Sequence, residues 1–231
     1  MIKEPVIENV PRHGDRGDSI IGLQRFPRTL TIAVSRQTGS RGGSIAQRVG
    51  RKLGWQVVDQ DLLEYMAQQG AANDELTAAA RQWADQRLQE LQQRGSLDAN
   101  QGETHLARVI LTLAAIGEVV LVGRGAGHLL PPDSTLHVRI VAPREERVAY
   151  FGQWQRLTPQ DSQREVDLRD SRRSQYMLDH FSVDAADPVY YDMVLNSGML
   201  GEEVCAQLIA DAAKAKMFND ESGEFRSLNP T

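Results

Sequence analysis

The sequence has little of what disulfides, zinc centres and membrane anchors require. It contains one cysteine, Cys205, which excludes an internal disulfide and any zinc site built from cysteines. Cys205 falls in a helical pattern, where a small buried side chain is expected. No apolar stretch approaches the roughly 20 residues that span a bilayer, and the first residues lack the apolar core of a secretory signal. These absences predict a cytoplasmic protein that does not enter a membrane.

Several kinds of chemistry also lack a motif. The sequence contains no HExxH, no GxSxG and no pair of histidines at ligand spacing, so nothing supports a resident metal or a serine nucleophile. The formal net charge of −5 argues against sequence-independent binding of nucleic acid, which needs a surplus of Lys and Arg. Any site for a polyanion must therefore be local.

The composition is that of one folded domain. Hydrophobic residues make up 41% of the chain and charged residues 25%, as in ordinary globular proteins. Five runs rich in β-branched residues are typical of strands: 30–34, 55–58, 119–122, 136–141 and 193–195. Helical patterns separate them, and Ile45, Val49 and Leu53 line one face of the first helix. This alternation predicts an α/β fold with a five-stranded parallel sheet, helices on both faces, and ligands at the carboxyl ends of the strands.

The segment from about 61 to 116 contains no convincing strand, and we expect a helical insertion there. One helix is expected to begin at Asn73 or Asp74 and to end at Gly95, with an apolar stripe of Leu76, Ala80, Trp83, Leu88 and Leu91. Helices within 73–116 have two open roles, covering a substrate or forming a homo-oligomer. We expect residues 1–28 and 217–231 to be flexible ends around a domain spanning 29–216.

A glycine-rich loop follows the first strand and opens the first helix. Its sequence, SRQTGSRGGS, spans residues 35–44 and contains three glycines, which let successive N–H groups converge on an anion. The positive end of the helix adds to this attraction. Arg36 and Arg41 flank the glycines and favour phosphate binding over a turn without a ligand. However, the loop has no lysine, the residue with which GxxxxGK[ST] loops neutralise phosphates.

Five stretches in the same order resemble the cytidylate kinase-like family of P-loop proteins, relatives of the nucleoside monophosphate kinases. They are the glycine-rich loop, GWQVVDQDLL, VVLVGRGAGHLL, TLHVRIVAPREERV and YYDMVLNSGMLGEEV. The resemblance covers about residues 29–213. It implies a three-layer P-loop NTPase fold, ATP with Mg²⁺, and a mobile lid at about residues 152–182.

The resemblance assigns nucleotide binding to the glycine-rich loop. The residues implied are Arg36, Gly39, Ser40, Arg41, Gly42, Gly43 and Ser44. Ser44 takes the place of the hydroxyl residue that holds Mg²⁺ with the nucleotide. In the family pattern GxxGSGKGT, the lysine falls on Gly42 and the first glycine falls on Arg36. Arg41 is the nearest replacement for the lysine, although its planar fork binds phosphate bidentately where a lysine acts as a point charge.

The turn Gly123-Arg124 ends a predicted strand and resembles the DGRDMG turn of cytidylate kinases. The arginine of that turn holds the acceptor phosphate, and the role falls on Arg124, with Gly125 in place of the family's aspartate. A dinucleotide-binding GxGxxG is disfavoured because His128 stands where the last glycine is needed. Asp59 matches the LDS position near the acceptor, and capping of the following helix is an equal alternative.

Three arginines, Arg169, Arg172 and Arg173, share one face of a predicted helix. The segment EVDLRDSRRSQYM that contains them resembles the arginine-rich lid that closes over ATP in cytidylate kinases. The alternative is a solvated helix whose arginines pair with Asp167 and Asp170.

The resemblance implies Mg²⁺-ATP-dependent phosphoryl transfer to a nucleoside monophosphate, with CMP or dCMP as the expected acceptor. In this interpretation Arg41, Arg124 and the three lid arginines act on the phosphates, and Asp59 and Gly123 bind the acceptor with Arg124. Two alternatives remain open. The missing lysine favours a nucleotide-binding sensor or interaction module without catalysis, and the unplaced base-reading residues leave room for a kinase of another small acceptor.

Overall fold

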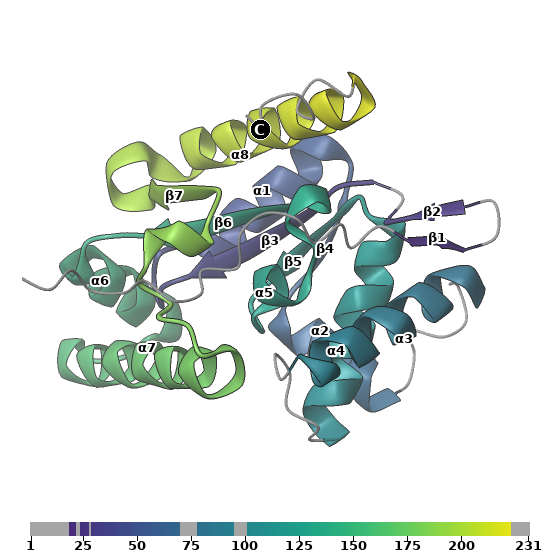
Figure 1. Ribbon diagram of the computed structural model, residues 1–231. Coiled ribbons are helices and arrows are strands. Elements are labelled where there is room, and N and C mark those ends of the chain that lie inside the picture. The colour runs from purple at the N-terminus through teal and green to yellow at the C-terminus, as the bar shows by residue number, and fades with distance from the viewer. Residues whose placement is uncertain (1–18, 22–23, 28, 70–77, 95–100, 223–231) are drawn as a thin grey trace, which may run out of the picture.

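A parallel sheet is the centre of the computed structural model, which describes residues 19–21, 24–27, 29–69, 78–94 and 101–222 (Figure 1). In spatial order its strands are β4 Gln56–Val58, β5 Val119–Val122, β3 Thr31–Arg36, β6 Thr135–Val141 and β7 Met193–Asn196. All neighbouring strands of this sheet are parallel. Each of the five strands predicted from the sequence is present, and the predicted fold class is confirmed.

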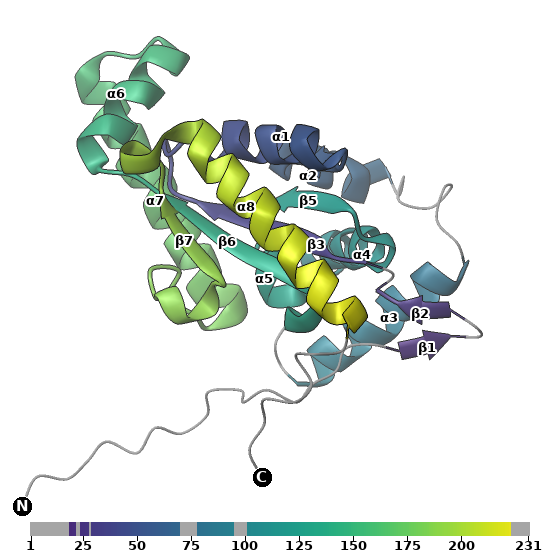
Figure 2. The same cartoon turned by 90° about the horizontal axis from the view of Figure 1, so that it is seen from above.

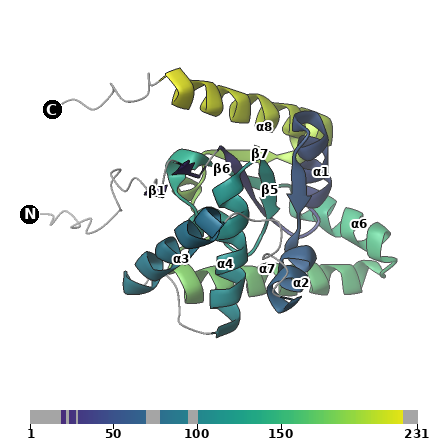
Figure 3. The same ribbon diagram turned by 90° about the vertical axis from the view of Figure 1, so that its right-hand side faces the viewer.

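Helices cover both faces of the sheet and give the fold three layers (Figures 2 and 3). One layer contains α1 Gly42–Leu53 and α8 Ser197–Ser222, and the other contains α2 Gln60–Gln69, α3 Ala78–Gln93, α4 Gln101–Ile116 and α5 Ala126–Leu129. In β3, Ile32 and Val34 pack toward α1 and α8, whereas Ala33 packs in the cluster with α2 to α5. The strands are apolar on both sides because both faces are covered.

The predicted helical insertion is present as α2, α3 and α4. The stripe predicted for α3 is confirmed at Ala80, Trp83, Leu88 and Leu91, which are buried in one cluster with α4. The predicted helix ends at 73–74 and 95, and Leu76, lie outside the described residues. Cys205 is buried on α8, as its helical pattern predicted.

Both ends of the described chain carry secondary structure that the sequence analysis did not predict. Strands β1 Ser19–Ile21 and β2 Gln24–Phe26 form an antiparallel hairpin beside α3. At the other end, α8 continues past the expected boundary at 216 to Ser222. Residues 1–18 and 223–231, the outer parts of the expected flexible ends, lie outside the described residues.

Two further helices, α6 Arg144–Gln155 and α7 Pro159–Phe181, pack on each other beyond the carboxyl end of β6. The segment expected to form the lid, residues 152–182, consists of the end of α6 and all of α7. Within the described ranges, no helix combines the length and apolar character needed to cross a membrane.

Helix α1 packs on the chain that leads into β4 at Gly50, where a methyl group has no room. A Cβ atom at Gly50 would lie 2.8 Å from Trp55 O and would collide with Val57 Cγ2, whereas a Cβ atom at Gly43 in the same helix would meet nothing within 4 Å. We predict that Gly50→Ala lowers the free energy of unfolding by about 1–3 kcal/mol. The matched control Gly43→Ala should raise it by about 0.5–1 kcal/mol, because alanine forms helix better than glycine. Urea denaturation measures both, and equal stabilities would contradict this packing.

Candidate functional site

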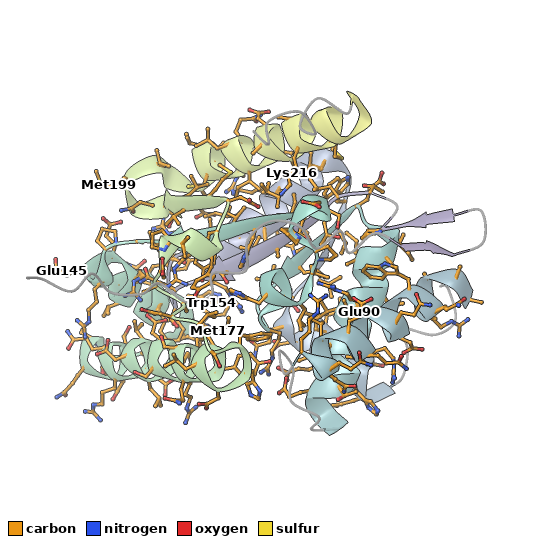
Figure 4. All side chains as sticks on the ribbon, in the orientation of Figure 1. Glu90, Glu145, Trp154, Met177, Met199 and Lys216 are labelled. Carbon is orange, nitrogen blue, oxygen red and sulfur yellow. The ribbon has the colours of Figure 1, made fainter. Side chains whose placement is uncertain are left out.

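A cavity of about 1010 Å³ opens at the carboxyl ends of β3, β4 and β5, the edge at which open parallel sheets bind ligands. The glycine-rich loop, the turns after β4 and β5, and helices α6 and α7 surround it. Trp154 of α6 and Met177 of α7, both labelled in Figure 4, line the cavity. Seven arginines line it: Arg36, Arg41, Arg124, Arg139, Arg169, Arg172 and Arg173. They outnumber the carboxylates of Asp59, Asp61, Glu165 and Asp170, so the cavity suits a polyanion.

The structure brings nearly all candidate residues from the sequence analysis to this cavity. Those of the loop, Arg36, Gly39, Arg41, Gly42, Gly43 and Ser44, line it together with Asp59, Gly123, Arg124 and the three arginines of α7. The exception is Ser40, which is buried beneath the loop and does not line the cavity.

Neighbouring elements fix the shape of the glycine-rich loop. Ser197 Oγ donates a hydrogen bond to Ser40 O at 2.7 Å, and Gln37 N donates to Ile140 O at 3.0 Å. Gly39 adopts φ +78° and lies against α6, where a Cβ atom would come within 2.8 Å of Arg147 C. Helix α1 then begins at Gly42, and its first N–H groups have no partner within the helix. The loop therefore presents a helix N-terminus, which attracts anions, to the cavity.

Arg36, the last residue of β3, occupies the space that two glycines leave open. Its Cβ lies where a side chain at Gly42 would begin, and its guanidinium lies against Gly123. Arg36 Nη2 donates to Gln60 Oε1 at 3.4 Å. Burial, with the nearby charges of Arg173 and Arg124, lowers the pKa of Arg36 to about 10. The guanidinium is therefore charged at neutral pH.

Arg41 points toward the rim of the cavity. Its side chain is 40% exposed, with Nη1 lying 3.8 Å from Glu202 Oε1 and the guanidinium lying 4.7 Å from the centre of the Tyr150 ring. Ser44 Oγ donates a hydrogen bond to Glu202 Oε2. Glu202 reaches the loop because α8 is interrupted at Gly201, whose φ of 75° and ψ of 165° are not helical.

The turn after β5 faces α2 across the cavity. Arg124 forms an ion pair with Glu64 of α2, and its guanidinium lies 5.7 Å from the centre of the Tyr176 ring. Asp59 Oδ1 accepts a hydrogen bond from Leu62 N at 3.0 Å, so it caps α2 while it also lines the cavity. Both roles considered for Asp59 are thus compatible with its position.

Asp170 connects α7 to the glycine-rich loop. Its Oδ1 accepts a hydrogen bond from Thr38 N at 2.8 Å, and its Oδ2 accepts one from Arg147 Nη1 at 2.6 Å. Arg147 is buried and also donates to Thr38 O at 3.0 Å. Arg173 Nη1 donates to Thr38 Oγ1 at 2.6 Å and to Asp170 Oδ1 at 3.2 Å. A carboxylate and two guanidinium groups therefore hold α6, α7 and the loop together.

The three arginines of α7 have different surroundings. Arg173 contacts the loop through Thr38, and Arg172 lines the cavity. Arg169 pairs with Glu165 at 3.1 Å in the manner of a solvated helix and lies 5.0 Å from the centre of the Phe151 ring. The proposed partner Asp167 instead pairs with Arg144 in the solvent, with 2.6 Å between Oδ2 and Nη2.

Aromatic contacts join α5, which follows the turn after β5, to the end of α7. The His128 ring lies 5.0 Å from His137 and 5.5 Å from Phe181, and His137 lies 4.5 Å from Tyr191. Burial lowers the pKa of His128 to about 4. Burial, with a smaller contribution from His128, lowers the pKa of His137 to about 3. Both imidazoles are therefore neutral and belong to the packing of this region.

Sequence reasoning missed Arg147, Glu64 and Glu202, and it considered Asp170 only as a solvated partner. Arg147 lies within the quoted stretch TLHVRIVAPREERV, where its spacing gives no sign that it turns inward. Glu202 follows Gly201, a glycine inside a helical pattern. That glycine was the one sequence signal of a break in the helix, and it could have pointed to Glu202.

Two aspartates on α7 allow a matched test of the connection between lid and loop. We predict that Asp170→Ala lowers the free energy of unfolding by about 2–3 kcal/mol, because Arg147 and Thr38 N lose a charged hydrogen-bond partner. Asp167→Ala breaks only a solvated ion pair and should change stability little. Urea denaturation of both variants measures the difference, and a loss at Asp167 equal to that at Asp170 would contradict the connection.

The buried histidines predict that the protein loses stability in mild acid. A histidine in the unfolded chain has a pKa near 6.5, so between about pH 6.5 and 4 the unfolded state binds a proton that the folded state does not bind at His128. Stability from this source is present above about pH 6.5 and falls as the pH decreases. His128→Phe should reduce that fall in urea denaturation measured across this range. The control is His105→Gln, a change at an exposed position on α4. If the stability of His128→Phe depended on pH as that of the wild type does, His128 would not be the source of the loss.

A comparison with solved structures finds similar chains at low sequence identity. A crystal structure of an uncharacterized protein from Eubacterium ventriosum has a TM-score of 0.58 and 14% identity, covering 81% of this chain and 99% of that chain. Shikimate kinase from Acinetobacter baumannii in complex with shikimate has a TM-score of 0.45 and 11% identity, with 81% and 94% covered. Shikimate kinase from Bacteroides thetaiotaomicron has a TM-score of 0.46 and 12% identity, covering 80% of this chain and 98% of that chain. These likenesses concern the fold alone.

A comparison with curated proteins finds no match. The model of the cytidylate kinase-like family matches residues 31–199, which include the glycine-rich loop, the turn after β5 and helices α6 and α7. Family and fold together support kinase-like phosphoryl transfer on a P-loop scaffold. The chain belongs to the cytidylate kinase-like family.

Proposed function

We propose that the protein transfers the γ-phosphoryl group of ATP to a nucleoside monophosphate, with CMP or dCMP as acceptor. In this reaction an oxygen of the acceptor phosphate forms a bond to the γ-phosphorus. The bond between the γ-phosphorus and the β,γ-bridging oxygen breaks, and its electron pair leaves with ADP. The acceptor phosphate reacts as its dianion, so the step requires no general base.

One observation carries this proposal: guanidinium groups from the loop, the turn after β5 and α7 surround one cavity beside the N-terminus of α1. Phosphoryl transfer is catalysed largely by positioning and by stabilising charge on the phosphates. A cavity with seven arginines and four carboxylates in its lining is suited to that task. The choice of a cytidine nucleotide rests on the family to which the chain belongs.

The residues divide between donor and acceptor. The first N–H groups of α1, from Gly42 to Ser44, would bind the donor phosphates, and Arg124 would bind the acceptor phosphate. Arg172 and Arg173 of α7 would contact the reacting phosphates from the other side of the cavity. Asp59 and Gly123 line the acceptor side.

The donor set beside the loop fits Mg²⁺. Ser44 Oγ and the carboxylate of Glu202 are hard oxygen ligands in mutual contact, and Mg²⁺ prefers such ligands together with water and phosphate oxygens. Ser44 would hold the ion, with Glu202 beside it. When bound, Mg²⁺ supplies positive charge that neutralises the phosphates of ATP.

A nucleotide-binding sensor without catalysis is the second candidate, and a specific observation favours it. Carboxylates engage two of the loop's donors, since Thr38 N donates to Asp170 and Ser44 Oγ donates to Glu202. Phosphate must displace or rearrange these contacts to bind there. A kinase of a different small acceptor is a third outcome that the same assay separates.

The assay uses ATP labelled in the γ-phosphate, Mg²⁺ and a panel of nucleoside monophosphates and small alcohols. We predict transfer to CMP or dCMP, and a decrease in kcat/KM on the order of 10²–10³ in Arg124→Ala, because one donor to the acceptor phosphate is lost. Arg108→Ala, on the exposed side of α4 and outside the cavity lining, is the control.

Three other outcomes would each decide against the proposal. ATP binding without transfer to any acceptor would support the sensor. Transfer only to a non-nucleotide would contradict the choice of acceptor. Equal losses in Arg124→Ala and Arg108→Ala would contradict the role of Arg124.

A further inference from the structure

We propose that Arg36 supplies the positive charge that the glycine-rich loop lacks at Gly42, and that these two positions have exchanged roles. In a GxxxxGK[ST] loop the lysine at the helix start reaches the β- and γ-phosphates. Here the helix start carries glycine, and the charged side chain comes from the end of strand β3. The inference rests on the proposed function only in that the ligand carries a polyphosphate.

The exchange follows from the space around Gly42. A Cβ atom at Gly42 would lie 2.6 Å from Arg36 Cβ and 3.0 Å from Arg36 Cγ, closer than two side chains can approach. The next nearest atom, Ile140 Cβ, would lie at an ordinary 3.7 Å. Gly42 is the first residue of α1 and does not adopt a positive φ, so its backbone does not require glycine. The absence of a side chain at Gly42 is therefore explained by the presence of Arg36.

The side chain of Arg36 crosses from the loop toward the acceptor side of the cavity. Its guanidinium lies so close to Gly123 that a Cβ atom there would collide with Nη1 and come within 3.0 Å of Cζ. Its Nη2 contacts Gln60, which follows β4. Strands β4, β5 and β3 are adjacent, so the guanidinium sits where the donor and acceptor sides of the cavity meet.

The charge of Arg36 is incompletely compensated. Its hydrogen-bond partner is the neutral side chain of Gln60, and no carboxylate of the described residues lies within ion-pair distance of its guanidinium. Arg173 and Arg124 repel it, and only the more distant charges of Asp59 and Asp61 favour it. A half-buried cation in this position is stabilised by an anion, and phosphate oxygens match the planar fork of a guanidinium.

Arg41 lies in the same loop but has a different setting. It is 40% exposed, and Glu202 and Tyr150 already contact its guanidinium. Both arginines line the cavity, but Arg36 is less exposed than Arg41 and has no carboxylate of the described residues within ion-pair distance, whereas Arg41 has Glu202 beside it. The role that the sequence alone assigned to Arg41 therefore passes to Arg36 in this proposal.

The experiment reverses the proposed exchange between positions 36 and 42. Arg36→Gly removes the cation, and the double variant Arg36→Gly/Gly42→Lys places a lysine at the helix start. Calorimetry measures binding of Mg²⁺-ATP and of inorganic tripolyphosphate, and the labelled assay measures transfer to CMP. We predict that Arg36→Gly weakens tripolyphosphate binding by about 10- to 100-fold, the effect of losing one charged hydrogen bond, and that the double variant recovers most of this loss. Arg41→Gly, the matched change in the same loop, should weaken binding less.

A second measurement tests the packing without any ligand. Thermal unfolding of Gly42→Ala should show a lower Tm than the wild type, because the new Cβ collides with Arg36 Cβ, and Arg36→Gly/Gly42→Ala should recover it. For the same reason Arg36→Ala/Gly42→Lys should be less stable than Arg36→Gly/Gly42→Lys, since alanine keeps the offending Cβ.

The outcomes separate this inference from the proposed function. If binding follows the predicted pattern but no acceptor is phosphorylated, the exchange stands and the kinase proposal fails. If the wild type phosphorylates CMP while Arg36→Gly binds tripolyphosphate as tightly as the wild type, the exchange is wrong and the kinase proposal stands. The exchange would also be wrong if Arg36→Gly/Gly42→Lys folds but binds tripolyphosphate no better than Arg36→Gly. It would be wrong as well if Arg41→Gly weakens tripolyphosphate binding more than Arg36→Gly does.

Discussion

The packing of the Arg36 side chain between Gly42 and Gly123 fixes the position of its guanidinium in the cavity. It uses two positions without side chains, one at the start of α1 and one at the end of β5, and these are the donor and acceptor sides of the proposed reaction. In a GxxxxGK[ST] loop the lysine comes from the helix start, on the donor side. A guanidinium at the end of β3 contacts both sides, and its fork can bind two phosphate oxygens at once.

The glycine-rich loop depends on the helices that follow β6 as much as on its own sequence. Gly39 lies against α6, Thr38 is bound by Arg147 and Arg173, and Asp170 accepts a hydrogen bond from Thr38 N. A phosphate oxygen and the Asp170 carboxylate cannot both accept that hydrogen bond. If a polyphosphate binds at the loop as proposed, its binding would be coupled to the position of α7, as expected of a lid at residues 152–182.

Local sequence patterns were enough to predict the sheet but not the contacts within the cavity. Five apolar, β-branched runs became five strands because a parallel sheet covered on both faces needs such runs. The glycine-rich loop was recognisable because three glycines and a helix start occur together. The hairpin β1–β2 escaped notice because its strands are three residues long and show no period. The hairpin contacts α3, and this tertiary contact cannot be predicted from the sequence of two short strands.

The sequence also showed two departures from the loop pattern, at positions 36 and 42, without showing that they are related. The relation is a contact between Cβ positions, which depends on the turn of the loop and cannot be read from spacing. Asp170 was undervalued for a similar reason, because its partner Thr38 lies 132 positions away. Arg41 attracted attention by being the closest cation to the glycines, although its left-handed φ of 61° turns the chain so that its side chain meets Glu202.

A crystal structure of the protein with Mg²⁺ and a non-hydrolysable ATP analogue would show whether Arg36 binds the phosphates. We predict a triphosphate over the N-terminus of α1, with the Arg36 guanidinium within hydrogen-bond distance of its β- or γ-phosphate oxygens. A triphosphate bound elsewhere, or one that contacts Arg41 while Arg36 remains on Gln60, would contradict it.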